Sequence, residues 1–211
     1  LVGSEMCIRD SPYGTQLHAA TWEDIFTAFP EVDGGIMDGW TESPYELVYH
    51  HGNAVFRELT DAQRDQAAAR GYDPARLDAG RRHLHARFQN FTPAEVDYYG
   101  DCGLLSELNL CDIDEDALYW LRWRRADGLR EGRAFRTALD EFPRKVLLGN
   151  GPRSAVFSGM TALDFHAWDE IVDLLLVKHY FWHRGFDGMY GTVARWVHQV
   201  QAWNPALNER Q

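Results

Sequence analysis

Three apolar runs, separated by segments with helical spacing, limit the fold more than any other feature of the chain. They read "VDGGIMD" from Val32, "RKVLLGN" from Arg144 and "DLLLVKHYFW" from Asp173. The third run is apolar on both faces, as strands of a parallel sheet are. Helical patterns surround the runs at 21–30, 112–143, 161–172 and 191–203, and Thr21 suits the N-cap of the first helix. Strands that alternate with helices are typical of parallel sheets, so the sequence predicts an α/β fold.

A long, mostly helical insertion is predicted between the first two strands, at about 41–110. Its polar helical patterns have Pro74 and Pro93 at positions typical of helix starts. A connection of this length usually carries function or forms a subdomain. We therefore expect one domain over 12–211 that contains this insertion.

The first residues, 1–11, do not fit this pattern. They read "LVGSEMCIRDS", which is similar to a translated sequencing adapter, and lack the basic start and apolar stretch of a signal peptide. We expect them to be an artefactual or disordered leader. The true N-terminus is then expected to be missing, and the compartment is left open.

Charge and composition argue against several classes of partner. The formal net charge of −11 makes nucleic acid and anionic membranes poor partners, because both require a basic surface. No apolar run approaches the roughly 20 residues that span a bilayer. The three cysteines form neither a disulfide framework nor a zinc motif, and no G-x-G-x-x-G turn is present. We expect no cofactor and no metal, although His50, His51, His179 and His183 keep a metal hydrolase as a weaker alternative.

Two of the predicted strands resemble those of a known family. The segments "FPEVDGGIMDGW" and "EIVDLLLVKHYFW" resemble strands of (β/α)8 glycoside-hydrolase-like proteins, the group around α-amylases, α-galactosidases and hypothetical glycosyl hydrolases. The likeness covers about 20–40 and 144–203, and Val177 stands where the family pattern often has proline. It implies part of a TIM-type barrel that acts on a carbohydrate or another small polar substrate. The oligomeric state is left open.

Asp38 is the leading candidate for a catalytic residue, because it directly follows the first predicted strand. The resemblance implies that it is the nucleophile or charge stabiliser of an oxocarbenium-like transition state. A glycosidase also needs a second carboxyl group. Asp187 and Asp164, on loops after strands, and Glu42 and Glu46, which closely follow Asp38, are the candidates. Asp164 could instead cap a helix.

Lys178 and His179 end the third predicted strand. A buried lysine is costly unless it is paired or functional, so Lys178 could hold a hydroxyl or a carboxylate, or form the Schiff base of a lyase or aldolase. A non-catalytic carbohydrate-binding barrel is a third alternative. Because the carboxyl ends of neighbouring parallel strands meet at one edge, we expect this pair to share a pocket with Asp38. The residues expected to bind substrate are Trp40, Glu42, His50, His51, Asn53, Asp164, Tyr180, Trp182, His183 and Arg184.

Overall fold

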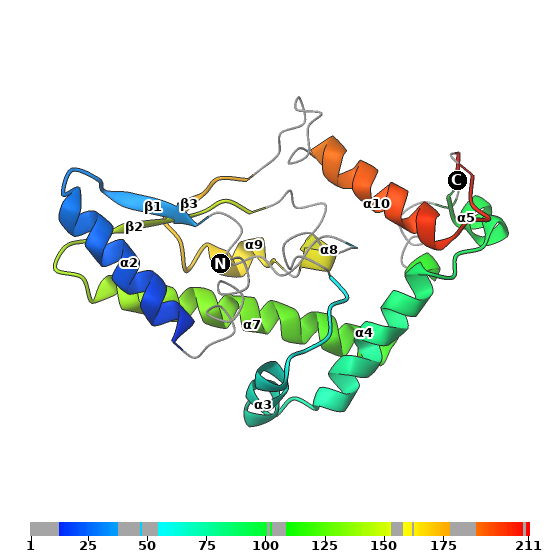
Figure 1. The fold of residues 1–211 in the computed structure, drawn as a ribbon, viewed down its shortest axis with the longest axis horizontal. Coiled ribbons are helices and arrows are strands. Elements are labelled where there is room, and N and C mark those ends of the chain that lie inside the picture. The colour runs from blue at the N-terminus through cyan, green and yellow to red at the C-terminus, as the bar shows by residue number, and fades with distance from the viewer. Residues whose placement is uncertain are drawn as a thin grey trace. The chain divides into compact units, whose positions relative to one another are not determined.

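The structure is a computed structural model of the 211-residue chain. It describes residues 13–37, 47, 55–100, 102, 109–152, 158–161, 163–177, 189–208 and 210–211. The chain divides into two compact units, which are taken separately below (Figure 1). Unit 1 comprises Leu1–Tyr45 and Arg124–His179, and unit 2 comprises Glu46–Trp123 and Tyr180–Gln211.

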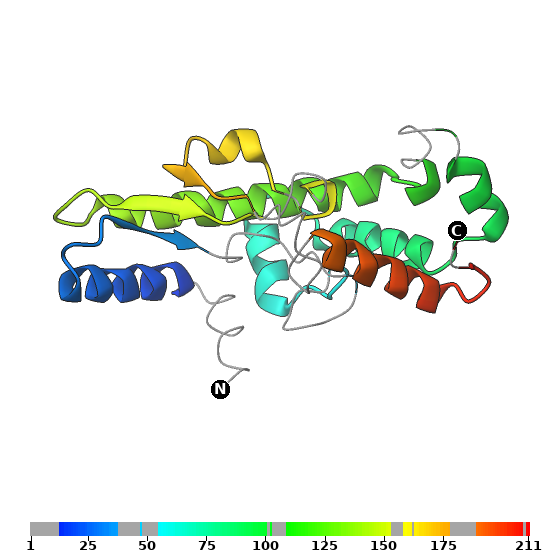
Figure 2. The same cartoon turned by 90° about the horizontal axis from the view of Figure 1, so that it is seen from above.

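Unit 1 contains a three-stranded parallel sheet in the order β1-β2-β3. The helix α7 contributes residues to both units. The elements of unit 1 are α2 (Gly14–Ala28), β1 (Gly34–Met37), the later part of α7 (Glu115–Asp140), β2 (Leu147–Asn150), α8 (Ser158–Thr161), α9 (Phe165–Trp168) and β3 (Leu174–Leu175). Figures 1 and 2 show α2 and α7 running alongside the sheet.

The predicted (β/α)8 barrel is wrong. Each of the three predicted strands is present and the strands are parallel, but the third is short: it ends at Leu175, not at Lys178 and His179 as predicted. Within the described residues the strands form an open sheet rather than a closed ring of eight. The physical reason is that barrels and open sheets use the same helix–strand units. Apolar runs at the right spacing therefore predict parallel strands but carry no information on whether the sheet closes.

One face of the sheet packs against α2 and α7. Leu148 of β2 is fully buried in a cluster with Phe135 of α7 and Trp168 of α9. Trp22 of α2 meets Phe135 edge-on at 5.1 Å between ring centroids, and packs over the backbone of Gly35 in β1. This cluster is the core of unit 1, and it fixes which side chains of each strand point toward the helices.

The start of α2 differs from the prediction. The helix begins at Gly14 rather than near Thr21, so that Thr21 lies in the middle of the helix. Its hydroxyl donates to the carbonyl of Leu17, four residues earlier, at 2.8 Å. Threonine can make this bond inside a helix as well as cap one, so its presence alone did not locate the helix start.

Unit 2 is helical in the described residues, and three of its helices lie within the predicted insertion. Its elements are α3 (Asp61–Ala69), α4 (Pro74–Phe88), α5 (Pro93–Gly100), the first part of α7, and α10 (Met189–Trp203). Pro74 is the first residue of α4, after the N-cap Asp73, and Pro93 opens α5. These two helix starts agree with the prediction.

The core of unit 2 is aromatic. Phe56 stacks on His85 at 4.9 Å and on Trp120 at 6.0 Å between ring centroids. Gly80 lets α4 and the start of α7 approach closely, since a Cβ there would lie 1.9 Å from the carbonyl oxygen of Asp116. In the ranges that the structure describes, no helix combines the length and apolarity needed to cross a membrane.

Candidate functional site

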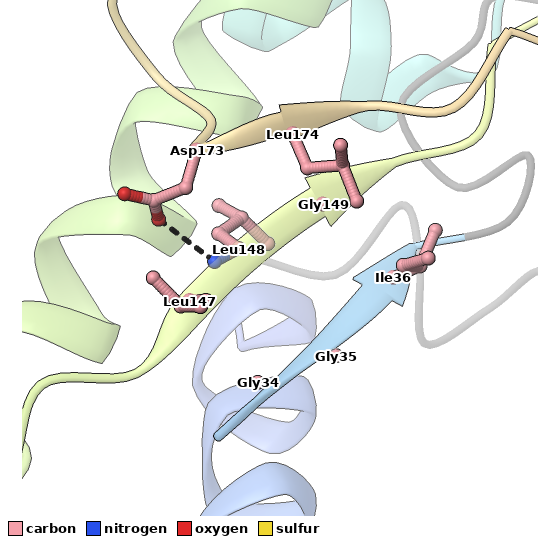
Figure 3. A pocket seen from close by; sticks show the side chains of 8 residues that line it. All are labelled: Gly34, Gly35, Ile36, Leu147, Leu148, Gly149, Asp173 and Leu174. Carbon is pink, nitrogen blue, oxygen red and sulfur yellow. Dashed lines mark hydrogen bonds between the residues drawn. The ribbon is translucent and has the colours of Figure 1, made fainter. Parts of the chain in front are cut away.

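The face of the sheet that bears Ile36, Leu147 and Leu174 carries an apolar hollow of about 440 Å³. Ile36, Leu147 and Leu174 surround it and are 45%, 45% and 51% exposed. Figure 3 shows how they lie around the strand backbones. The lining residues are Gly34, Gly35, Ile36, Leu147, Leu148, Gly149, Asp173 and Leu174. The hollow therefore offers an apolar surface with a floor of glycine backbone.

The glycines in this floor have a packing reason. A Cβ at Gly34 would lie 2.2 Å from the carbonyl oxygen of Leu147 on the next strand. A Cβ at Gly149 would lie 2.8 Å from Cγ1 of Ile36. The close approach of the adjacent strand thus explains why both positions are glycine. The two glycines do not by themselves indicate a ligand.

Asp173 is the ionisable residue among those that line the hollow, and its carboxylate is already bonded. Its Oδ2 accepts the backbone N–H of Leu148 at 2.9 Å, as Figure 3 shows, and lies 3.3 Å from the guanidinium of Arg136. A carboxylate held in this way fixes β3 to β2 and to α7. The hollow therefore presents no uncommitted acid or base for catalysis among its lining residues.

The carboxyl ends of the three strands form a row at one edge of the sheet. Met37 of β1 lies beside Asn150 of β2, which lies beside Leu175 of β3. The row continues in the backbone, where Gly151 N donates to Met37 O at 2.9 Å and Leu176 N donates to Asn150 O at 2.8 Å. Ligands of open α/β sheets bind at such an edge.

Most of the predicted site residues follow this row in the sequence and lie outside the described residues, so their shared pocket stays a prediction. The predicted catalytic residues outside the described ranges are Asp38, Lys178, His179 and Asp187. The predicted substrate-binding residues outside them are Trp40, Glu42, His50, His51, Asn53, Tyr180, Trp182, His183 and Arg184.

Asn150, the last residue of β2, is the polar side chain that the structure adds to this edge. It is 0% exposed, and neither its Nδ2 nor its Oδ1 has a hydrogen-bond partner among the described residues. A buried amide without partners costs about 1–3 kcal/mol for each lost group, so such a residue needs an explanation. Sequence analysis missed it, because an asparagine after a strand is equally typical of a turn.

Asp164 is the predicted site residue that the structure describes, and it caps α9. Its Oδ1 accepts the backbone N–H groups of His166 and Ala167 at 3.2 and 3.1 Å. Its Oδ2 accepts from Nε of Arg125 on α7 at 2.8 Å. Burial opposes ionisation, but the Ala167 N–H and the Arg125 guanidinium outweigh it and hold the pKa of this carboxyl below its ordinary value. The capping alternative is confirmed, and a role in substrate binding stays a prediction.

Comparisons with known proteins add no relative. No protein family model, curated protein or solved structure matches the chain. Together with the open sheet, this overturns the resemblance to glycoside-hydrolase barrels. Across the described ranges, no group of three or more His, Cys, Asp or Glu residues is placed to hold a metal ion.

Proposed function

We propose that the chain binds a carbohydrate at the carboxyl edge of its sheet and acts on it through carboxylate chemistry. The observation that supports this is the row formed by Met37, Asn150 and Leu175. Asp38 directly follows Met37 and Lys178 closely follows Leu175, so both begin from the same edge of one parallel sheet. The abundance of aromatic residues also suits stacking on sugar rings.

The proposed chemistry depends on the charges at this edge. A carboxylate at Asp38 near a lysine stays ionised, because an opposite charge lowers its pKa. An ionised carboxylate stabilises an oxocarbenium-like transition state or attacks the anomeric carbon. This role needs no closed barrel, since it requires only an acid that follows the end of one strand.

Asp38→Asn tests the proposal. We expect this variant to lose about 100-fold or more of the release of reducing sugar from a panel of neutral oligosaccharides, with folding unchanged by circular dichroism. Asp24→Asn is the matched control, because Asp24 is an exposed acid on α2 away from the strand end. Equal activity of Asp38→Asn and wild type on a hydrolysed substrate would contradict the proposal.

A further inference from the structure

The sheet of unit 1 is apolar on both of its faces. One face carries Leu148, which is buried in the core cluster with residues of α7 and α9. The other face, here called the hollow face, carries Ile36, Leu147 and Leu174, which line the hollow and stay about half exposed. Parallel sheets are usually covered on both faces, because both are apolar. The hollow face is therefore a surface of unit 1 at which a covering partner is expected.

The hollow face has a regular alternation of large and small residues. The strand register pairs Gly34 with Leu147, Ile36 with Gly149, and Gly149 with Leu174. Both glycines belong to this face, because an added Cβ would meet Leu147 at Gly34 and Ile36 at Gly149. Each of the three aliphatic side chains therefore stands beside a glycine of the neighbouring strand (Figure 3).

This alternation makes the hollow face complementary to itself. When a two-fold axis relates two copies, the same surface of each copy forms the interface. An axis that runs across the strands at the level of Leu148 reverses the strand direction in the second copy. Leu147 of each copy then lies opposite Gly149 of the other, and on β1 the same holds for Ile36 and Gly34. Large side chains thus meet glycines rather than one another, as interdigitation between packed sheets requires.

Charge also favours a second copy as the partner. The residues that line the hollow are aliphatic or glycine apart from Asp173, whose carboxylate accepts the N–H of Leu148 and pairs with Arg136. Two copies can therefore meet here without facing uncommitted like charges, although each has a net charge of −11. A strongly basic or acidic partner would find no complementary charge among these lining residues.

The size of the hollow face limits the strength of the contact. A standard interface buries about 800 Å² on each partner. The aliphatic side chains around the hollow, with Leu176 two residues beyond Leu174 on the same face, make a smaller patch. We therefore expect two copies to pair at high concentration and to separate on dilution.

We propose that a second copy of this chain covers the hollow face, with the two sheets packed face to face about a two-fold axis. The aliphatic side chains of each copy enter the hollow of the other and leave water together. The pairing goes beyond the proposed function and does not depend on it, because it uses the face of the sheet and not its carboxyl edge.

The test measures self-association of the full chain by sedimentation velocity, from about 1 μM to about 1 mM. We expect monomer at the low end and a growing fraction of dimer toward the high end. Leu147→Lys should weaken dimerisation by about tenfold or more, because an unpaired ammonium group would be buried in the contact. Leu17→Lys is the matched control and should dimerise like wild type, because Leu17 is a half-exposed leucine on α2. Circular dichroism checks that both variants fold.

Leucine methyl NMR of wild type locates the contact without relying on a variant. The methyl signals of Leu147 and Leu174 should shift with concentration, and those of Leu17 should not. These shifts, with dimerisation weakened in Leu147→Lys, support the inference, and the shifts alone decide if Leu147→Lys does not fold. Monomer at every concentration overturns it, as does a dimer that folded Leu147→Lys leaves intact. Contacts of the Leu147 methyls with another segment of the same copy also overturn it.

Discussion

Gly132 of α7 lies directly against the indole of Trp168 from α9. A Cβ added to Gly132 would lie 2.4 Å from Cη2 of Trp168, which is closer than two such carbons approach in proteins. Trp168 is buried in the core of unit 1 beside Phe135 and Leu139, so its ring has little free space to move into. The missing side chain at Gly132 is what allows α9 to pack on α7.

Gly132→Ala is predicted to lower the free energy of unfolding by about 1–3 kcal/mol, because the added methyl overpacks the core. This direction opposes helix propensity, which favours alanine over glycine by up to about 1 kcal/mol. Urea unfolding followed by tryptophan fluorescence measures the difference. Gly159→Ala is the control, since a Cβ there would meet no other element of the described residues within 4 Å. Equal stability of wild type and Gly132→Ala would show that the indole can shift.

Neighbouring leucines on β2 should respond differently to the same substitution. Leu148 is 0% exposed and packs in the core, whereas Leu147 is 45% exposed beside the apolar hollow. Leu148→Ala is expected to cost about 2–5 kcal/mol of unfolding free energy, the range for buried leucines. Leu147→Ala should cost less than half as much in the same urea titration. Similar losses would mean that the face of Leu147 is also covered in solution.

Sequence alone was enough to predict the parallel strands but not the sheet that they form. The apolar runs at Ile36, Leu148 and Leu174 indicate strands, because a short apolar run bounded by turn residues is typical of a buried strand. Closure of a sheet depends on strand number and tilt, which no short run encodes. The apolar runs therefore predicted single strands, whereas the barrel that the resemblance implied was wrong.

The site was less predictable than the fold for a related reason. The sequence drew attention to the acidic and aromatic residues after the strands, because carboxylates can act in catalysis and aromatic rings can stack on a ligand. Asn150 has no such signal, and only its burial without a hydrogen-bond partner among the described residues distinguishes it from a turn residue. Asp164 is the opposite case. The sequence indicated a catalytic or binding carboxylate, but in the structure this carboxylate caps α9 and accepts a hydrogen bond from Arg125.

Asn204, which follows α10 and is 4% exposed, accepts the N–H of Phe91 and donates to the carbonyl of Phe88, so Asn204→Leu is predicted to destabilise unit 2. The substitution leaves the N–H of Phe91 and the carbonyl of Phe88 without their partner, at about 1–3 kcal/mol for each group. Hydrogen exchange at the Phe91 amide gives a local measure, and we expect it to accelerate at least about tenfold. Asn90→Ala removes only an exposed bond to Ala86 O and should leave that exchange unchanged. Unchanged exchange in Asn204→Leu would contradict the role assigned to Asn204.

The pH dependence of unit 2 should include a contribution from Glu95 at the start of α5. The Thr92 hydroxyl, then the Arg87 guanidinium and the Thr92 backbone N–H, lower the pKa of this carboxyl from 4.5 to about 2. A lowered folded-state pKa stabilises the fold above the unfolded value, and the contribution is lost as pH falls from 4.5 through about 2. Because the carboxyl is exposed and screened by solvent, we expect a small effect.

Thr92→Val tests this contribution, because it removes the hydroxyl and should move the Glu95 pKa back toward 4.5. The measurement is a carbon-13 NMR titration of the Glu95 carboxyl in wild type and in Thr92→Val. In a second measurement, the stability difference between wild type and Glu95→Gln should shrink as the pH is lowered from 4.5 toward about 2. The same titration midpoint in wild type and Thr92→Val would show that the hydroxyl does not hold the carboxylate. In that case Arg87, 2.8 Å from Oε1, and the backbone N–H of Thr92 would have to account for the lowered pKa.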